Sequence, residues 1–277
     1  MMLTASQLKS FLREHQLRLT KRLGQHHLVD AGAIRRIVEA CGLSPDETVV
    51  EIGAGLGALT EPLAARAGRV IAVEIDRRIA ALLQERMRPL GNVEVRHGDI
   101  LEFPWAEVAG ATVVGAIPYH ITSPILVALS EQREAFRQIV LVLQDEVAAR
   151  LLAEPGTKAY GRLSVLAQYA WELSSRFTVP RSAFFPQPDV DSRCITLLPR
   201  AKPAVQVQDE ALFFDLVKRA FAHRRKTLVN CLSDSGALGR AQVEAAVRTL
   251  GCPASIRGET LSLEQFARLA ATLAGAR

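Results

Sequence analysis

A glycine-rich segment, Glu51–Gly57, reads Glu-Ile-Gly-Ala-Gly-Leu-Gly and follows an apolar run that predicts a β-strand. Its glycines allow a tight turn and a close approach of the backbone to a ligand. Dinucleotide enzymes space such glycines as GxGxxG and hold a pyrophosphate at the next helix N-terminus. Here the spacing is GxGxG, and Glu51 stands two residues before the first glycine, Gly53. A carboxylate there repels phosphates and suits a cation. The segment therefore favours S-adenosylmethionine (SAM), a sulfonium without phosphate, over NAD, with Gly53 and Gly55 at the cofactor.

Carboxylates also end the next two predicted strands. Glu74 lies 23 positions after Glu51, where an acid accepts hydrogen bonds from both ribose hydroxyls. Asp99 ends the third strand and is placed to accept from the adenine amine, with Ile100 against the ring. Any one of these acids alone would more often be a helix cap or a surface residue. Three at successive strand ends, beside a glycine-rich turn, favour a cofactor site.

A third chemical feature is the segment 115–121, Gly-Ala-Ile-Pro-Tyr-His-Ile, which follows another apolar run. Pro118 fixes the direction of the backbone. Tyr119 offers a ring on which a base could stack, a contact worth about 1–3 kcal/mol. Enzymes that methylate an exocyclic base nitrogen place such a Pro-Tyr corner beside their methyl donor, with Asn, Asp or Ser at its first position. This chain has Ala116 there, without a polar side-chain atom.

The elements that must position these residues alternate along the chain. Strands are expected at 48–52, 69–74, 93–96, 112–114 and 138–143, and helices at 31–41, 59–67, 77–87, 123–130 and 146–153. Short apolar strands alternating with helices predict a parallel sheet covered on both faces. Residues 163–179 and 192–198 resemble two further strands, antiparallel at one edge. After a linker at 199–203, residues 209–232, 240–250 and 262–274 read as helices. We therefore expect an α/β domain over 1–200, with an N-terminal basic arm, and a small all-α domain over 201–277.

Composition restricts the class of partner. The 277 residues are 49% hydrophobic and carry a net charge of +5. Residues 1–30 have a net charge of +3 and residues 201–277 of +4, whereas the segment between them is near neutral. Two basic ends indicate an anionic partner, although solvated helix faces would look the same. The four cysteines lack metal-ligand spacing, and no membrane span or signal peptide is expected. These features indicate a cytoplasmic protein with reduced thiols.

Several longer segments resemble the KsgA-type ribosomal RNA adenine N6,N6-dimethyltransferases (the RsmA family), nearly from end to end. They are Lys21–Gln25, the glycine-rich segment, Glu74-Ile75-Asp76-Arg77, Leu143–Val147, Ala159–Val165, Ser182–Ser192, and Phe221 with Arg224–Thr227. The resemblance implies a Rossmann-like SAM-dependent methyltransferase domain and a helical C-terminal domain. It implies dimethylation of two adjacent adenosines in a loop near the 3′ end of small-subunit ribosomal RNA, late in ribosome assembly.

Residue by residue, the resemblance assigns cofactor contacts to His26, Leu28, Gly53, Glu74, Asp99 and Ala116, and Ile75 lies within one of the matching motifs. The family usually has Gln-Asn-Phe-Leu where this chain has Gln25-His26-His27-Leu28. A neutral His26 could still donate or accept one bond, whereas its protonated form would repel the sulfonium and weaken cofactor binding at low pH. A metal site at the two histidines is disfavoured because no third ligand is in view.

An exocyclic adenine amine is a poor nucleophile, and two hydrogen-bond acceptors on its hydrogens favour the reactive form. In the family these are the first corner side chain and a neighbouring backbone carbonyl, here that of Ile117. The catalytic corner is therefore Ala116, Ile117, Pro118 and Tyr119. The lost acceptor at Ala116 costs about 1–3 kcal/mol, or a roughly 5- to 150-fold slower step. Three interpretations stay open: a slower methyltransferase, with its usual or an altered substrate, a non-catalytic SAM- and RNA-binding assembly factor, or an engineered alanine.

The basic ends supply the candidate RNA contacts. Lys21 and Arg22 lie in the N-terminal arm, and Arg224, Arg225 and Lys226 lie on an expected helix. Phosphate contact is the functional interpretation, and a solvated helix face is the alternative. Aromatic residues make up only 5% of the chain, so recognition of a folded RNA by shape is favoured over stacking along a single strand. A monomer is expected because RNA contacts need the surface.

Overall fold

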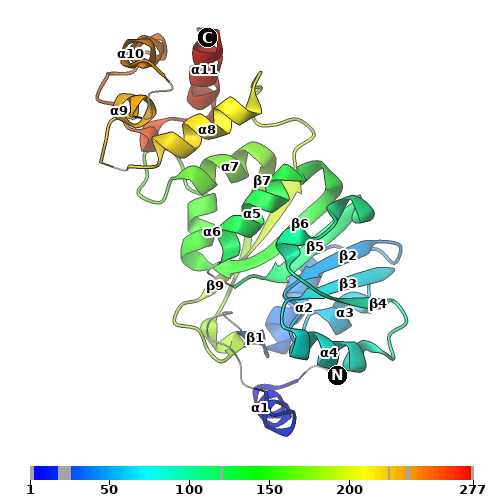
Figure 1. Cartoon of the computed structure of the whole chain (residues 1–277). Helices are drawn as coiled ribbons and strands as arrows, with labels where there is room; N and C mark the ends of the chain where they lie inside the picture. Colours follow the sequence, from blue (N-terminus) through cyan, green and yellow to red (C-terminus); the bar gives the residue numbers. More distant parts are fainter. Residues whose placement is uncertain (1–2, 18–25, 119–120, 224, 235–237, 276–277) are drawn as a thin grey trace. The chain divides into compact units, whose positions relative to one another are not determined.

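The computed structural model describes residues 3–17, 26–118, 121–223, 225–234 and 238–275 (Figure 1). The chain divides into two compact units, Met1–Ala148 with Glu172–Pro199, and Ala149–Trp171 with Arg200–Arg277. The sequence analysis placed the start of the second part at residue 201. Residues 149–171 belong to it as well, because Tyr160 and Tyr169 are buried in its hydrophobic core.

A seven-stranded sheet in the order β4-β3-β2-β5-β6-β9-β7 forms the centre of the first unit. Its strands are β2 (Thr48–Ile52), β3 (Arg69–Glu74), β4 (Val93–His97), β5 (Ala111–Ala116), β6 (Phe136–Gln144), β7 (Trp171–Val179) and β9 (Ser192–Pro199). The first five are parallel, and β9 pairs antiparallel with β6. The expected α/β class is confirmed. Nearly every residue of β2, β3 and β5 is buried, as expected for strands covered on both faces.

Helices and one small ribbon complete this unit. They are α1 (Ala5–Glu14), α2 (Ala31–Ala40), α3 (Thr60–Ala64), α4 (Arg77–Met87), α5 (Thr122–Glu131), and β1 (His27–Leu28) paired antiparallel with β8 (Phe184–Phe185). Helix α6 (Asp145–Leu151) follows β6. Side chains fix where the helices begin: Asp30 accepts from the Ala33 amide at 2.7 Å, and Asp76 caps α4 at the amides of Arg78 and Ile79.

The expected strand over 163–179 is wrong in its first half. Residues Arg162–Ala170 form α7, and only Trp171–Val179 is extended. Because α7 buries most of its residues, an apolar run there fits a buried helix as well as a strand. The helix start is fixed locally, since the Ser164 hydroxyl accepts from the Gly161 amide at 3.0 Å and donates to the Arg150 carbonyl.

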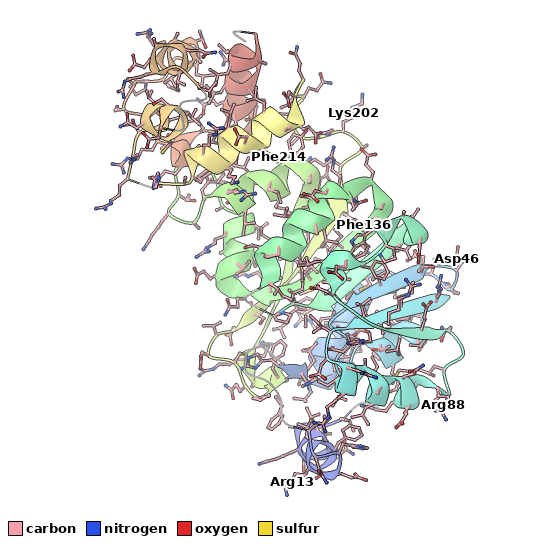
Figure 2. The ribbon with its side chains drawn as sticks, viewed as in Figure 1. Arg13, Asp46, Arg88, Phe136, Lys202 and Phe214 are labelled. Carbon is pink, nitrogen blue, oxygen red and sulfur yellow. The ribbon has the colours of Figure 1, made fainter. Side chains whose placement is uncertain are left out.

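The second unit is helical. It comprises α7, α8 (Glu210–Ala220), α9 (Leu228–Ser233), α10 (Arg240–Thr249) and α11 (Leu263–Ala274). Figure 2 labels Phe214 on α8, whose ring meets Tyr169 edge-on at a centroid distance of 5.2 Å. The single helix expected over 209–232 is two helices, because Thr227 caps a new one by accepting from the Asn230 amide. None of the helices in the described residues is long and apolar enough to cross a membrane.

The sheet has a switch point between β2 and β5. From β2 the chain builds β3 and β4 on one side, and then β5 and β6 on the other. Ligands bind at the carboxyl ends of parallel strands at such a point. Gly115, near the end of β5, faces β2 closely: a Cβ on it would lie 2.7 Å from the Ile52 carbonyl oxygen.

Gly115→Ala should therefore lower the free energy of unfolding by about 1–3 kcal/mol, because the added methyl overlaps β2. Gly91→Ala is the matched control, since a Cβ there meets nothing within 4 Å. Urea denaturation of both variants tests this. Equal stabilities would show that the two strands separate easily at this point.

Candidate functional site

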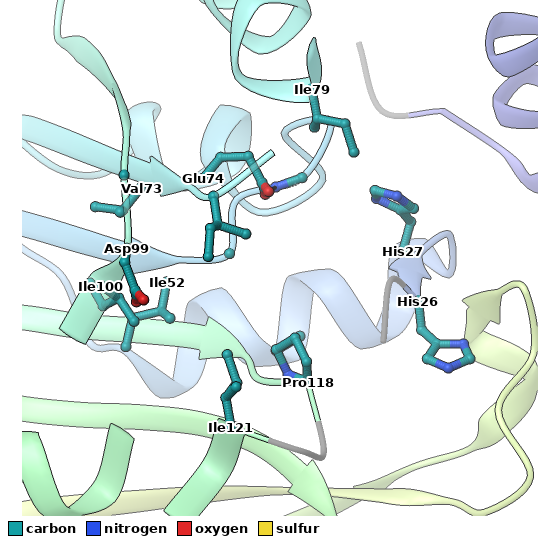
Figure 3. Close-up of a pocket in the computed structure, with 15 residues that line it drawn as sticks. His26, His27, Ile52, Val73, Glu74, Ile79, Asp99, Ile100, Pro118 and Ile121 are labelled. Carbon is teal, nitrogen blue, oxygen red and sulfur yellow. Dashed lines mark hydrogen bonds between the residues drawn. The ribbon is translucent and has the colours of Figure 1, made fainter. Parts of the chain in front are cut away.

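A pocket lies at the carboxyl ends of β2, β3, β4 and β5, at the switch point (Figure 3). Its empty space, including the open mouth, is ≈ 680 Å³. Four chain segments that are distant in sequence meet here, because parallel strands end at one edge of a sheet. The lining residues are His26, His27, Ile52, Gly53, Gly55, Val73, Glu74, Ile75, Ile79, Gly98, Asp99, Ile100, Ala116, Pro118 and Ile121.

All but one of the predicted cofactor residues line this pocket. The exception is Leu28, whose side chain is 5% exposed and packs in the core around α2. The pocket has six further lining residues that were not predicted from the sequence: His27, Ile52, Val73, Ile79, Gly98 and Ile121. Adjacent residues of a strand face opposite sides, so the short strand β1 can present His27 or Leu28 to the pocket but not both. Only the pairing of β1 with β8 settles which one.

Three consecutive amides of the glycine-rich turn donate hydrogen bonds within the protein. The amides of Gly53 and Ala54 both donate to the Val73 carbonyl, at 2.9 and 3.1 Å. The Gly55 amide donates to Glu74 Oε2 at 2.8 Å. Gly53 and Gly55 have φ of 68° and 56°, which glycine adopts without strain. These three amides are therefore already used and are not available to a pyrophosphate, which dinucleotide sites bind through such donors.

Glu74 connects the turn to the end of β3. Its second oxygen, Oε1, accepts from the Asp76 amide at 2.9 Å. Burial raises the pKa of this carboxyl, and the backbone amides of Asp76 and Gly55 oppose that rise. A carboxylate offers about four lone-pair sites, so two amide bonds leave capacity for ribose hydroxyls.

Asp99 and two isoleucines form the next part of the pocket. Asp99 follows β4 and accepts from the Leu101 amide through Oδ1 at 3.0 Å. Ile75 is 48% exposed, which is high for a large apolar side chain, and Ile100 is buried. A flat apolar ring with a polar edge, such as adenine, would cover Ile75 and Ile100 while its amine faces Asp99. These residues therefore fit the adenosine part of SAM.

Glu51 does not face the pocket, so its predicted role towards a cation is wrong. It is 2% exposed, and its Oε2 accepts from the Thr60 hydroxyl at 2.5 Å. Burial raises its pKa to about 8; the Thr60 bond lowers it and the charge of Glu74 raises it further. Near neutral pH this side chain is therefore mostly protonated, and it joins β2 to the helix α3.

Two adjacent imidazoles form the side of the pocket away from Asp99 (Figure 3). His26 Nδ1 lies 2.6 Å from the Pro186 carbonyl oxygen, so Nδ1 carries the hydrogen in that bond. His27 is partly buried, and the loss of solvent around its ring, followed by the charge of His26, lowers its pKa to about 4. It is therefore neutral at physiological pH. Within the described ranges, no group of three or more His, Cys, Asp or Glu side chains could hold a metal ion.

The corner after β5 is anchored to the sheet. The Ile117 amide donates to the Val142 carbonyl at 3.2 Å, and its side chain is buried. Ala116 and Pro118 line the pocket, and both also line a smaller adjoining cavity with Ile117. The site thus has room at position 116 and no polar atom on that side chain. Tyr119 lies outside the described residues.

The candidate RNA contacts are only partly described. Lys21, Arg22 and Arg224 lie outside the described residues. Arg225 and Lys226 lie between α8 and α9, not on a helix as expected, and both are exposed. Lys226 Nζ forms an ion pair with Asp234 at 2.6 Å, and this bond raises the lysine pKa. Part of the Lys226 charge is therefore already compensated, and Arg225 is the better described candidate.

Comparison with known proteins gives a consistent result. The chain matches the family "Ribosomal RNA adenine dimethylase" over residues 16–274. It is 42% identical to the ribosomal RNA small subunit methyltransferase A of Geobacillus kaustophilus, covering 98% of this chain and 96% of the relative. Among solved structures, it resembles a dimethyladenosine transferase from Plasmodium falciparum with a TM-score of 0.75 and 26% identity, over 88% of this chain and 96% of that one. It also resembles the 23S rRNA methyltransferase ErmE with a TM-score of 0.66 and 32% identity, over 89% and 99%.

The buried Glu51 generates a prediction about pH. Its folded pKa of about 8 exceeds the ordinary value of 4.5, so the folded state holds one more proton between these values. The free energy of unfolding contributed by Glu51 should therefore fall as pH rises from about 5 to 8, by up to about 1.4 kcal/mol per unit. Glu51→Gln keeps an acceptor for Thr60 and removes the titration.

Urea denaturation of both proteins at pH 5.5, 6.5 and 7.5 measures this. His27, with its lowered pKa, contributes the opposite trend at the acidic end, but it is present in both proteins and drops out of the difference. The stability of the wild type should decline relative to Glu51→Gln across the series. A constant difference would mean that Glu51 is ionised in the folded protein.

Proposed function

This chain belongs to the ribosomal RNA adenine dimethylase family, and we propose that it transfers methyl groups from SAM to N6 of adenosines in small-subunit ribosomal RNA. One observation carries the proposal: the glycine-rich turn, Glu74, Asp99 and the Pro118 corner follow four neighbouring parallel strands and line one pocket. The proposed reaction is dimethylation of two adjacent adenosines in a loop near the 3′ end of that RNA, coupled to assembly of the subunit.

Different residues of the pocket bind different parts of the cofactor. Glu74 accepts from the ribose hydroxyls while it keeps the glycine-rich turn in place. Asp99 accepts from the adenine amine, and Ile75 and Ile100 cover the ring. When bound, SAM supplies an electrophilic methyl group on its sulfonium. The internal bonds of the Gly53, Ala54 and Gly55 amides support SAM over NAD, because these three donors are not available to a phosphate.

The corner holds the target base. Pro118 and the bond from Ile117 to β6 fix its direction, and the Ile117 carbonyl accepts one hydrogen of the adenine amine. Tyr119, by family resemblance, stacks on the base. The protein thereby orients the amine in line with the methyl group, and no covalent intermediate with the enzyme is needed.

Ala116 favours a second candidate function. The corner has one side-chain acceptor fewer than the enzymes with Asn, Asp or Ser at this position, while the pocket for SAM is intact. A protein that binds SAM and RNA but methylates slowly would still act as a ribosome assembly factor. The two candidates share every binding residue and differ in the rate of methyl transfer.

The partner is small-subunit ribosomal RNA within the small ribosomal subunit, bound by the basic ends of a cytoplasmic, monomeric protein. The net charge of +4 over residues 201–277 and the exposed Arg225 support phosphate contact. The proposal requires neither a metal ion nor a membrane.

Ala116→Asn should increase the rate of methyl transfer roughly 5- to 150-fold, because the amide oxygen restores the second acceptor. The cavities on both sides of position 116 leave space for it. The assay is the initial rate of labelled methyl incorporation into adenines of unmethylated small subunits at saturating SAM. Ala116→Leu is the control, since it matches Asn in size without an acceptor. Equal rates for Asn and Leu would exclude the missing acceptor as the limiting defect.

Arg225→Ala should weaken binding to the small subunit and reduce the slope of log affinity against log salt concentration by about 1, as for the loss of one phosphate contact. Lys202→Ala removes the same charge from an exposed position of the same unit (Figure 2) and serves as the control. Binding isotherms at three salt concentrations provide the measurement. Identical slopes in the two variants would place the RNA contact elsewhere.

A further inference from the structure

A second groove lies away from the cofactor pocket, where α2 faces the edge strand β7. Its empty space, including the wide open mouth, is ≈ 640 Å³. The lining residues are Arg36, Glu39, Ala40, Ser175, Arg176 and Phe177. We call it the α2–β7 groove. None of these residues lines the cofactor pocket, so the groove is not part of the site described above.

Two arginines determine the charge of the α2–β7 groove. Arg36 and Arg176 are both exposed, and neither forms an ion pair with a carboxylate in the described part of the chain. Both of their charges act to lower the pKa of the Cys194 thiol, against the burial that raises it to about 12, so the two guanidinium groups lie near one point of the unit. Glu39 also lines the groove and offsets part of the positive charge. Both guanidinium groups therefore remain available to an anionic ligand.

The guanidinium of Arg36 is held in place by an aromatic ring. Its carbon atom Cζ lies 3.9 Å from the centroid of the Phe177 ring. Stacking of this kind covers the plane of a guanidinium and leaves its N–H edge free to donate. Phe177 in turn packs against the hydrophobic core around α2. Arg36 is therefore oriented before a ligand arrives, and less side-chain freedom is lost when an anion binds.

This chemistry fits a phosphate group. The planar fork of a guanidinium matches two phosphate oxygens, and charged donors of this kind form the stronger hydrogen bonds. Ser175 adds a hydroxyl to the groove, and because its oxygen accepts from Arg193 Nη1 at 3.4 Å, its own hydrogen is left to donate. An open groove admits a phosphate that belongs to a long chain, whereas an enclosed cavity would suit a small free ion.

We propose that the α2–β7 groove binds a backbone phosphate of the small-subunit ribosomal RNA. The inference deepens the proposed function and rests on it, since it takes this RNA as the partner. Charge patterning placed the candidate RNA contacts at the two ends of the chain and left the segment between them near neutral. The groove adds a contact within that segment, in the same unit as the Pro118 corner. It holds the RNA by its backbone and reads no base.

Variants that each remove one charge test the proposal. Arg36→Gln and Arg176→Gln act in the groove, whereas Arg35→Gln acts at the neighbouring exposed position of α2, which does not line the groove. Binding isotherms at three salt concentrations are measured with unmethylated small subunits and with a protein-free transcript of their RNA. Thermal melting and calorimetry with SAM check that each variant is folded.

Arg36→Gln and Arg176→Gln should each reduce the slope of log affinity against log salt concentration by about 1 with both partners, and the double variant by about 2. Glu39→Gln, which removes the acid from the groove, should tighten binding. Unchanged slopes in the groove variants, or an equal reduction in Arg35→Gln, would overturn the proposal. A loss seen with intact subunits alone would indicate a ribosomal protein as the partner and would also overturn it. A wild type that binds neither partner would instead refute the proposed function.

Discussion

The hydrogen bond from the Gly55 amide to Glu74 is the constraint on which the site depends. It joins the turn after β2 to the end of β3, across two strands that the chain must bring together from 19 residues apart. The carboxylate is buried, and its two amide bonds keep it in place at the cost of desolvation. Gly53, Ala54 and Gly55 all donate internally, so these three amides serve the shape of the turn. A cofactor with phosphate groups would find fewer free donors here than in a turn whose amides point outwards.

The polar chemistry of the pocket is divided between its two sides. Carboxylates stand at the ends of β3 and β4, and imidazoles stand on the segment before α2. The corner after β5 contributes backbone and an alanine methyl. Polar side chains therefore stand on two sides of the pocket, whereas the corner offers backbone groups and a methyl group. This division is the reason we expect Ala116 to affect the rate of methyl transfer more than folding or cofactor binding.

Much of this arrangement could be predicted from the sequence, for a physical reason. Parallel strands end at one edge, so Gly53, Glu74, Asp99 and Ala116 had to meet once the α/β rhythm was assigned. The predictions that were wrong concern the burial of a side chain or its contacts with distant residues, which a local sequence pattern does not contain. Glu51 also lies near the end of a strand, as Glu74 and Asp99 do. Its side chain, however, is buried and bonded to Thr60, and it does not line the pocket.

The remaining errors have a similar origin. Which of His27 and Leu28 faces the pocket depends on a ribbon with β8, more than 150 residues away. Likewise, Tyr160 and Tyr169 join the helical unit through contacts with residues beyond 200. The apolar run before Trp171 is buried as a helix, and its composition alone does not distinguish that from a strand.

Gly115 and Ala116 have opposite tolerances although they are adjacent. A methyl group on Gly115 would meet the backbone of β2, whereas the side chain of residue 116 faces open space on two sides. Gly115 therefore fixes where the corner lies, and residue 116 determines which chemical group the corner presents. A substitution at residue 116 is therefore expected to change the chemical group that the corner presents without moving the backbone that carries it.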